Sequence, residues 1–366
     1  MTRPVRVAVW GTGDVGHYAL RGVISHPDLE LVALRTTTAA KVGTDAGDVI
    51  GWDATGVLAV DSDTAVLEAG PHALVYAGRS KTWEPVLPYL EAGVNVAYLG
   101  VTGLLDPPSL DPEVRAPLQK AAVAGGASIM YGGIDPGFTT QLLPFVLTSI
   151  SERVDRLTLY EVRDYDPLPP HQLDYFGLGR PDTTQAAKFR PGGLERTWGS
   201  SLRALARAMG VEVDDVVEFH ETRPAPEDFD IPARRIAKGT IAAVRFGLSG
   251  LVDGQERLRI EHVNRLRRDL APEWPGEQGY GVRIEGQPDY DLHLSLRDPA
   301  GRQQRPALFG TAMYGVNAVP SLVQAPAGIV TQLDLLPFGC RNVGGRHQDD
   351  NWVISQRVTA EGERRP

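Results

Sequence analysis

The sequence predicts an α/β protein whose first half forms a doubly wound parallel sheet. A short apolar strand over Val5–Trp10 runs directly into a glycine-rich turn at residues 11–16, and a helical stretch at residues 17–24 follows it. Further strand-like and helix-like segments alternate as far as Met130. Alternation of strands and helices of this size is typical of a parallel sheet with helices on both faces.

The elements that support this prediction follow one another in order. After the first strand, apolar strand-like runs recur at residues 29–34, 73–77, 95–99 and 127–130, and helix-like segments occupy residues 17–24, 83–92 and 112–124. In a doubly wound sheet the ligand lies beyond the carboxyl ends of the strands. The residues to inspect are therefore those at 11–16, 35–38, 77–80 and 100–103.

The first of these turns has the spacing of a dinucleotide-binding (Rossmann-type) turn. Gly11 allows a tight turn, Gly13 lets the backbone approach a pyrophosphate, and Gly16 lets the helix pack closely. The helix N-terminus then presents free N–H groups to the phosphates. An ordinary glycine-rich surface turn is the alternative. The expected cofactor-binding residues are Gly11, Thr12, Gly13, Asp14, Val15, Arg35, Thr36, Thr37, Ala77, Gly78, Leu99 and Gly100.

The loop after the second strand indicates which nucleotide binds. An acidic residue there normally holds the ribose hydroxyls of NAD, whereas an arginine accommodates the 2′-phosphate of NADP. This chain has Arg35 followed by three threonines, with Lys41 close behind and no acidic residue between Glu30 and Asp45. Arginine and hydroxyl groups suit a phosphate. We therefore expect NADP, with NAD possible, against the alternative that Arg35 and Lys41 are solvated surface charges.

Composition indicates a two-domain enzyme that stays in the cytoplasm. Of the 366 residues, 42% are hydrophobic, no apolar run is long enough to cross a membrane, and no signal peptide is visible. Cys340 is the only cysteine, which excludes an internal disulfide and fits a reducing compartment. A net charge of -9 argues against nucleic acid or an anionic membrane as partner. The expected divisions are 1–136, 137–305, 306–345 and a tail at 346–366.

The second domain is expected to be α+β with a mixed or antiparallel sheet. Strand-like runs lie at residues 156–162, 239–246, 256–264, 281–285 and 290–296, with helical stretches at 139–148 and 200–209, the latter followed by the segment 211–217. Such a sheet leaves one face open to a substrate or a second copy of the chain, so we expect a homodimer. Residues 165–180 are either a lid over the site or a loop that covers the core.

Five motifs resemble a known group of enzymes, the dihydrodipicolinate reductase-like oxidoreductases, in the branch of 2,4-diaminopentanoate dehydrogenase and NAD(P)-dependent amine dehydrogenases. These motifs are WGTGDVG at 10–16, GGIDPGF at 132–138, GLGRP at 177–181, IEHVNR at 260–265, and the segment from Thr311-Ala312-Met313 through Ile329-Val330-Thr331. The resemblance implies an NAD(P)-binding domain and a second domain that completes the active site and usually builds a dimer. It also implies that a C-terminal helix, at residues 312–324, returns to the first domain.

The sequence also departs from this group. Reductases proper carry a His-His-x-x-x-Lys motif that has no counterpart after Leu159, and amine dehydrogenases generally carry an acidic residue after the fifth strand, where this chain has Leu99-Gly100-Val101-Thr102-Gly103-Leu104. The proton-handling group is therefore elsewhere or absent. Candidates near the domain junction are Asp135, Glu161, Asp164, Tyr165, His171, Tyr175 and His262. We predict Glu161, Tyr165 and His171 as catalytic residues, and no metal site.

The sequence leaves two functions open. The favoured one is an NADP-dependent oxidoreductase acting on a small amine, imine or carbonyl compound, because hydride transfer needs only a placed nicotinamide, a proton-handling group and a substrate-binding site. Reduction of a cyclic imine or an activated carbon double bond belongs to the same class. The alternative is a noncatalytic NADP-binding sensor or assembly protein that has lost the acid. For Glu161 itself, the alternative is a solvent-facing side chain or a buried ion pair with Arg163.

Overall fold

The computed structural model describes residues 3–78, 82–100, 102–165, 168–298 and 304–343. The chain divides into two compact units, one formed by Met1–Ile134 with Ala307–Pro366 and the other by Asp135–Pro306. The predicted tail at 346–366, and Arg79 and Ser80 of the loop at 77–80, lie outside the described residues. In the described part of the chain, no helix is long and apolar enough to span a membrane.

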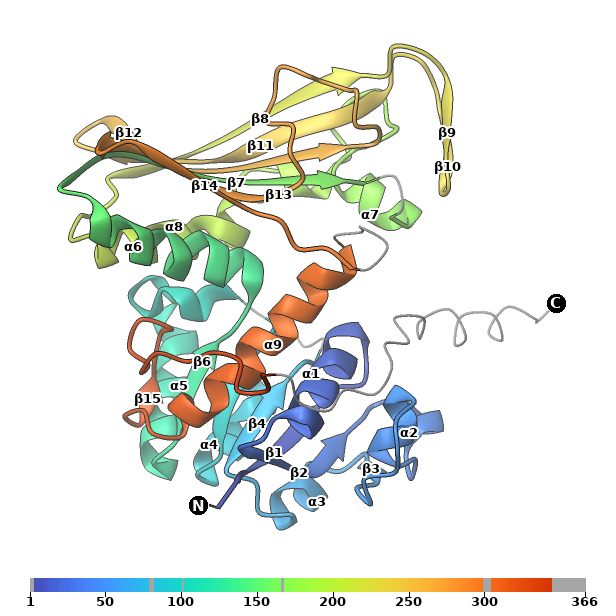
Figure 1. Ribbon diagram of the computed structural model, residues 1–366, viewed down its shortest axis with the longest axis vertical. Coiled ribbons are helices and arrows are strands. Elements are labelled where there is room, and N and C mark those ends of the chain that lie inside the picture. The colour runs from blue at the N-terminus through green and yellow to red at the C-terminus, as the bar shows by residue number, and fades with distance from the viewer. Residues whose placement is uncertain (1–2, 79–81, 101, 166–167, 299–303, 344–366) are drawn as a thin grey trace. The chain divides into compact units, whose positions relative to one another are not determined.

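The first unit contains a parallel sheet of seven described strands (Figure 1). Its order is β15-β6-β5-β4-β1-β2-β3, and every neighbouring pair runs parallel. The strands are β1 (Val5–Trp10), β2 (Leu29–Arg35), β3 (Ala59–Val60), β4 (Ala73–Tyr76), β5 (Asn95–Tyr98), β6 (Ser128–Tyr131) and β15 (Gly328–Ile329). Because β1 lies between β4 and β2, the order of the strands reverses beside the glycine-rich turn.

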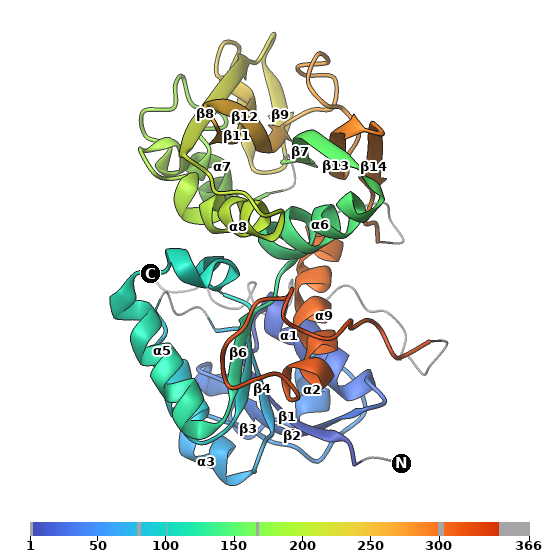
Figure 2. The same cartoon turned by 90° about the vertical axis from the view of Figure 1, so that its left-hand side faces the viewer.

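Helices cover both faces of this sheet (Figure 2). They are α1 (Asp14–Ser25), α2 (Ala46–Ile50), α3 (Asp63–Glu68), α4 (Leu87–Glu91), α5 (Pro112–Gly125) and α9 (Gln304–Leu322). Val7 and Val9 of β1 belong to the core that α1 and α9 complete, whereas Ala8 belongs to the core on the side of α4 and α5. Successive side chains of a strand point to opposite faces, so a strand buried on both faces is apolar throughout.

Two predicted helices of this unit differ from the structure. The helix expected at 83–92 is a 3-10 turn at Glu84–Val86 followed by the short helix α4. Pro85 and Pro88 lack the backbone N–H groups that a continuous helix would need. The helix expected at 312–324 begins earlier, at Gln304.

The second unit contains a mixed sheet of six described strands in the order β14-β13-β7-β12-β11-β8. Its strands are β7 (Arg153–Asp164), β8 (Asp215–Pro224), β11 (Ile241–Val252), β12 (Gln255–Arg265), β13 (Gly279–Gln287) and β14 (Tyr290–Leu294), and a small hairpin pairs β9 (Phe229–Ile231) with β10 (Arg234–Ile236). β12 runs parallel to β7, and the other pairs are antiparallel. The predicted fold class, a doubly wound parallel sheet with a second α+β domain, is confirmed.

Helices of the second unit lie on one side of its sheet, as Figure 1 shows for α6 (Leu143–Leu147) and α8 (Glu195–Ala208). Trp198, Leu202 and Leu205 of α8 belong to the same core as Phe246 of β11. Val244, Phe246 and Leu248 of β11 project toward these helices, and the residues between them project toward the opposite face. The described helices leave that opposite face uncovered. This arrangement leaves one face of the sheet covered and one open.

The irregular segments of this unit were predicted less well. The helix expected at 139–148 is present but irregular: wider π-helical turns reach Leu142, α6 follows, and a tighter 3-10 turn at Thr148–Ile150 ends it, whereas Asp135, Pro136 and Gly137 before it have non-helical backbone angles. The loop expected at 165–180 contains the short helix α7 (Pro170–Tyr175). The strands β8, which begins at Asp215, β9 and β10 were not predicted.

Candidate functional site

The glycine-rich turn of the first unit has the shape expected of a phosphate-binding turn. Gly11 has a φ of 115°, and a Cβ atom on Gly16 would lie 2.1 Å from the carbonyl oxygen of Gly11, so the turn and α1 pack too closely for a side chain. A Cβ atom on Gly13 would meet no described heavy atom within 4 Å. Gly13 precedes α1 without a side-chain cap, so open space borders a helix N-terminus.

Polar side chains from the loop after β2 contact this turn. Thr36 is fully buried, and its hydroxyl group lies 2.9 Å from the hydroxyl group of Thr12. Lys41 Nζ donates a hydrogen bond of 2.8 Å to the carbonyl oxygen of Thr12. Thr37 is exposed. Neither Lys41 nor Thr36 is therefore a freely solvated group, and the loop after β2 is attached to the turn after β1.

Arg35, the last residue of β2, is held by neighbouring groups rather than projecting freely into solvent. Its Nε atom lies 3.0 Å from Asp63 Oδ1, and its side chain is 13% exposed. The guanidinium group also donates to the carbonyl oxygen of Thr36 and lies 5.3 Å from the centre of the Trp10 ring. The alternative that Arg35 is a solvated surface charge is wrong, because an ion pair and an aromatic ring hold it.

The remaining residues predicted to bind the cofactor lie at the same edge of the sheet. Asp14 and Val15 begin α1, and the backbone N–H of Ala77 donates to the carbonyl oxygen of Trp10 at 2.8 Å. Leu99 is buried and Gly100 is exposed. A Cβ atom on Gly78 would lie 2.5 Å from the Tyr76 ring. These residues follow β1, β4 and β5, so their positions agree with the rule that ligands bind beyond the strand ends.

In the second unit, sheet register aligns one row of side chains. His262 of β12 pairs with Phe246 of β11 and with Glu161 of β7, and Glu161 pairs with Tyr280 of β13. Directly paired residues project from the same face of a sheet. The His262 ring stacks on the Phe246 ring at 5.1 Å between centres. The sheet therefore places an imidazole, a carboxyl group and a phenol side by side on its covered face.

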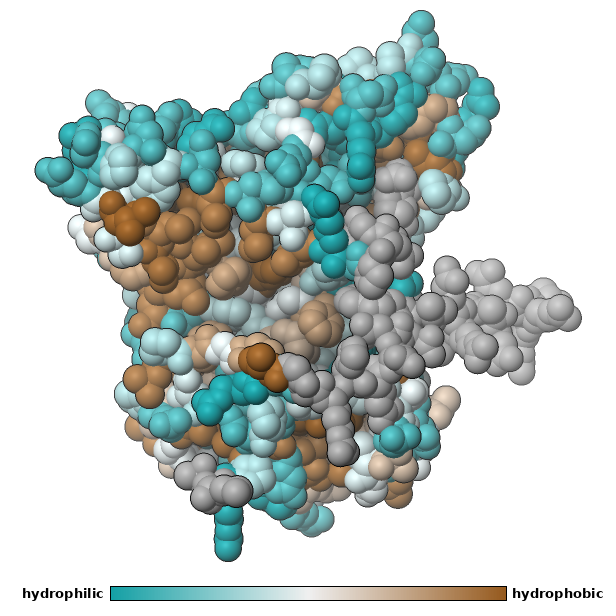
Figure 3. All heavy atoms as spheres, in the orientation of Figure 1, coloured by the Kyte–Doolittle hydropathy of each residue, from teal (hydrophilic) through white to brown (hydrophobic). Residues whose placement is uncertain are grey.

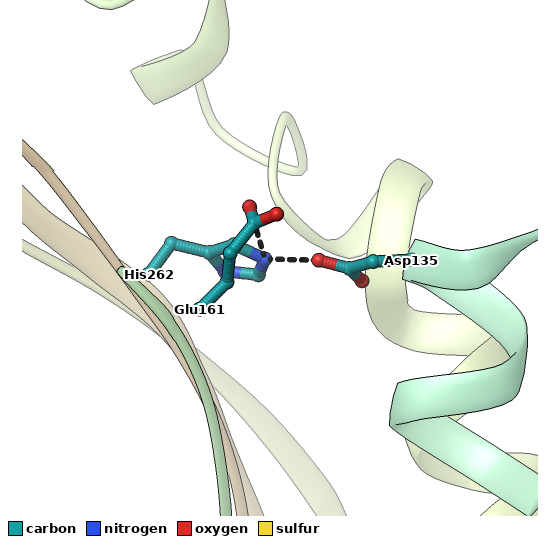
Figure 4. Close-up of side chains that lie close together, drawn as sticks. All are labelled: Asp135, Glu161 and His262. Atoms are coloured by element: carbon teal, nitrogen blue, oxygen red, sulfur yellow. Dashed lines mark hydrogen bonds and ion pairs between the residues drawn. The ribbon is translucent and has the colours of Figure 1, made fainter. Parts of the chain in front are cut away.

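Asp135 completes a cluster with His262 and Glu161, shown in Figure 4. His262 Nε2 lies 2.9 Å from Asp135 Oδ2 and 3.9 Å from Glu161 Oε2. Trp198 Nε1 donates a hydrogen bond of 3.0 Å to the other carboxylate oxygen of Asp135. These residues, Trp198 excepted, line a cavity of about 10 Å³, which is the room that one water molecule needs.

The buried environment of His262 indicates which of its nitrogen atoms carries the proton. Its side chain is 3% exposed, and Nδ1 is buried without a hydrogen-bond partner among the described residues. A proton on Nδ1 would therefore be left unsatisfied, whereas a proton on Nε2 is donated to Asp135. We infer that Nε2 carries a proton.

The same three residues are the type of group that could hold a metal ion, although the sequence predicts no metal site. In protein metal sites, a ligating histidine usually donates its second N–H to an acceptor. Binding a metal through His262 Nε2 would move the proton to Nδ1, which has no described acceptor. The donor set therefore fits a metal ion poorly and fits a proton-handling group better.

Glu161 is the carboxyl group of the cluster with the perturbed pKa. Burial raises the pKa of Glu161 above its ordinary 4.5, and the nearby Asp135 carboxylate raises it further, while Arg163 and His262 oppose this rise. Arg163 Nε lies 3.3 Å from Glu161 Oε1. The alternative of a buried ion pair between these residues is thus realised. It is compatible with proton transfer, because a raised pKa brings a carboxyl group toward neutral pH.

A buried lysine lies next to this cluster. Lys188 is 3% exposed, its Nζ atom lies 4.2 Å from the centre of the Trp198 ring, and it donates to the hydroxyl group of Thr197. Burial lowers the pKa of Lys188 to about 8, although Asp135 and Glu218 oppose this change. Lysine side chains are seldom fully buried, so this residue is unusual.

The structure brings together only some of the predicted catalytic residues. Glu161 lies in the cluster. Tyr165, four residues further along the chain, is buried, and the centre of its ring lies 5.4 Å from that of Phe176. His171 is exposed on α7 and does not line the cavity. Asp135 and His262 were candidates from their sequence position. Trp198, Lys188 and Tyr280 were missed, because only the sheet register and the packing of α8 reveal them.

Comparison with known proteins places the chain in a family. Residues 138–347 match the 2,4-diaminopentanoate dehydrogenase C-terminal domain. The chain is 33% identical over 349 residues to an amine dehydrogenase of Streptomyces virginiae, a match that covers 90% of this chain and 96% of the relative. The chain belongs to this dehydrogenase family. The predicted resemblance is therefore confirmed, and membership in an oxidoreductase family does not favour the noncatalytic alternative.

More distant matches agree with this family. A 2,4-diaminopentanoate dehydrogenase of Acetoanaerobium sticklandii is 25% identical over 237 residues, which is 63% of either chain. Among solved structures, an amine dehydrogenase from Mycobacterium smegmatis has a TM-score of 0.71 at 22% identity and covers 92% of this chain and 97% of its own. GenD2 from gentamicin A biosynthesis, solved in complex with NAD, has a TM-score of 0.50 at 15% identity, with 87% of each chain covered. The two structures support the fold alone.

Proposed function

We propose that this protein is an NADP-dependent dehydrogenase, with NAD also possible, that interconverts a small amine and the corresponding imine or carbonyl compound. The observation that carries the proposal is the buried cluster of Asp135, His262 and Glu161 in a chain of the amine dehydrogenase family. The first unit binds the nucleotide, and Glu161 takes the place of the family carboxylate missing from residues 99–104.

The glycine-rich turn supports the assignment of the nucleotide. The open space at Gly13 and the uncapped N-terminus of α1 suit a pyrophosphate, because a helix N-terminus offers free N–H groups and a positive dipole end. Arg35 and the exposed Thr37 would face the 2′-phosphate of NADP, while the buried Thr36 would hold the loop against Thr12. When bound, the nicotinamide ring accepts or supplies a hydride.

The cluster supports the proton-handling role of Glu161. An amine gives up its hydride only from the neutral form, so the ammonium proton must first move to a base. Glu161 takes that proton, while the Asp135 carboxyl group accepts hydrogen bonds from His262 Nε2 and Trp198 Nε1. The cavity of about 10 Å³ beside them has room for one amino group, which is about the size of a water molecule.

The test is the absorbance of the reduced nicotinamide with NADP and NAD, offered separately against primary amines, and in reverse with ketones plus ammonia and with cyclic imines. Turnover with an amine, and loss of that turnover in Glu161→Gln with nucleotide affinity unchanged, supports the proposal. Glu285→Gln, an exposed position on β13, is the matched control. Tight nucleotide binding without any turnover would contradict the amine chemistry.

We also propose that the protein is a homodimer. The face of the second sheet opposite α8 carries no described helix. On the other side of that sheet, Val146 of α6 and Ile150 of the turn after it are 55% and 66% exposed. Hydrophobic side chains gather over α6 in Figure 3. Apolar surface of this kind is often covered by a second copy of the chain. Light scattering that gives a mass near 39.6 kDa would contradict a dimer.

A further inference from the structure

One acidic side chain links the ends of β1 and β2 in the first unit. Asp63, the first residue of α3, accepts three hydrogen bonds at its Oδ1 atom. The donors are Arg35 Nε at 3.0 Å, Trp10 Nε1 at 3.1 Å and Tyr89 Oη at 2.7 Å. Trp10 ends β1 and Arg35 ends β2, so Asp63 connects the strand ends where a dinucleotide's ribose is bound in this fold.

Asp63 is an anion at neutral pH. Partial burial by itself raises the pKa of Asp63, but hydrogen bonds from Tyr89, Trp10 and Arg35 outweigh this effect and hold the pKa below its ordinary 3.8. The side chain of Asp63 is 46% exposed, whereas that of Arg35 is 13% exposed. Solvent, or a ligand, can therefore approach the carboxylate more easily than the guanidinium group that it neutralises.

This arrangement affects the two nucleotides differently. A 2′-phosphate that reached Arg35 would share the guanidinium group with the Asp63 carboxylate, and two anions beside one cation repel each other. The ribose 2′-hydroxyl group of NAD carries no charge, so the carboxylate does not repel it and can accept its hydrogen bond.

We propose that Asp63 is a specificity-determining residue that restrains the preference of this chain for NADP and allows NAD to bind as well. The inference rests on the nucleotide site of the proposed function and concerns one contact within it. Arg35 attracts the 2′-phosphate, and Asp63 occupies and neutralises Arg35. The preference for NADP over NAD then reflects the attraction of the 2′-phosphate to Arg35 minus its repulsion by Asp63, rather than the effect of Arg35 alone.

The experiment measures binding of two nucleotide fragments by calorimetry, without any turnover. The fragments 2′,5′-ADP and 5′-AMP differ only in the 2′-phosphate. Asp63→Asn removes the charge but keeps a carbonyl oxygen that can accept the hydrogen bonds from Trp10 and Tyr89. Asp61→Asn, an exposed position two residues away, removes an equal charge without touching Arg35 and serves as the control.

We expect Asp63→Asn to raise the affinity for 2′,5′-ADP relative to 5′-AMP about tenfold, and Asp61→Asn to change this ratio by less than about twofold. The gain shrinks between about 0.05 and 0.5 M salt, because salt screens charges near the surface. A structural role for Asp63 would not produce this salt dependence. If Asp63→Asn folds poorly, Asp63→Ser, which also removes the carboxylate, replaces it.

Two results overturn the inference. An unchanged or lowered ratio in Asp63→Asn, with both fragments bound, would mean that Asp63 orients Arg35 for the phosphate or only supports the loop; the proposed function would then stand. Failure of the wild-type protein to bind NADP, NAD and both fragments would instead overturn the nucleotide site itself, and this inference with it.

Discussion

Replacing the buried Lys188 with methionine should stabilise the protein at neutral pH. Methionine keeps an unbranched side chain against the Trp198 and Tyr175 rings but removes the ammonium group. The Thr197 hydroxyl group, which accepts the hydrogen bond from Lys188, also lies within 3.5 Å of the carbonyl oxygen of Gly193 and so keeps a partner. The substitution therefore removes a buried charge with little loss of packing.

The size of the effect follows from the pKa of Lys188, which burial lowers from 10.5 to about 8. Each pKa unit corresponds to about 1.4 kcal/mol, so the buried ammonium group costs the folded state roughly 3 kcal/mol at pH 7. The contact with the Trp198 ring at 4.2 Å offsets part of this cost, by about 1–2 kcal/mol for a desolvated pair. We expect Lys188→Met to be more stable than wild type by about 1–2 kcal/mol.

The pH dependence provides the stricter test. The folded protein binds fewer protons than the unfolded chain between about pH 8 and 10.5, so wild-type stability rises with pH across this window as the cost of the buried charge disappears. The advantage of Lys188→Met, measured by urea unfolding at several pH values, should therefore be constant below about pH 8 and shrink above it. Lys238→Met, at an exposed lysine of the same unit, is the control. A less stable variant at pH 7, or an advantage independent of pH, would refute the reasoning.

Four further substitutions test the two candidate sites. Gly13→Val should abolish nucleotide binding while changing the free energy of unfolding by less than about 1 kcal/mol, because no described atom lies within 4 Å of the new Cβ. Gly16→Ala, whose Cβ meets a carbonyl oxygen at 2.1 Å, should instead destabilise the fold by about 1–3 kcal/mol. Equal stability of the two variants would contradict this reasoning. Arg35→Asp should weaken NADP binding, measured by calorimetry, by about 2 kcal/mol and NAD binding less, so equal losses would rule out its role in selection. Glu161→Gln should become more stable relative to wild type as the pH rises above 4.5, because a raised pKa means that ionising the buried carboxyl group costs stability. The free energies of unfolding of both proteins are measured at pH 5 and at about pH 8. The same difference between them at both pH values would count against a raised pKa.

The first unit could be predicted largely from local sequence signals. The apolar strand Val5–Trp10, the three glycines and the helix after them lie within a few residues of one another, so spacing alone indicates the turn and the strand end where a ligand binds. The same local signals predicted the alternation of strands and helices. They did not predict the pairing of Arg35 with Asp63, because these residues are separated by 28 positions and meet only when β2 and α3 are in place.

The cluster of Asp135, His262 and Glu161 was beyond such local reasoning. Glu161 and His262 meet because β7 and β12 run parallel in a register that pairs them, although 101 positions separate them in the chain. Asp135 reaches them from a non-helical turn segment, and a local pattern does not show toward which distant strands such a turn directs its side chains. Register shifts by one residue would turn either side chain to the other face of the sheet. Sequence by itself therefore determined the residue types and the fold class. The tertiary structure decided which charges are buried together, because burial and strand pairing are properties of distant segments.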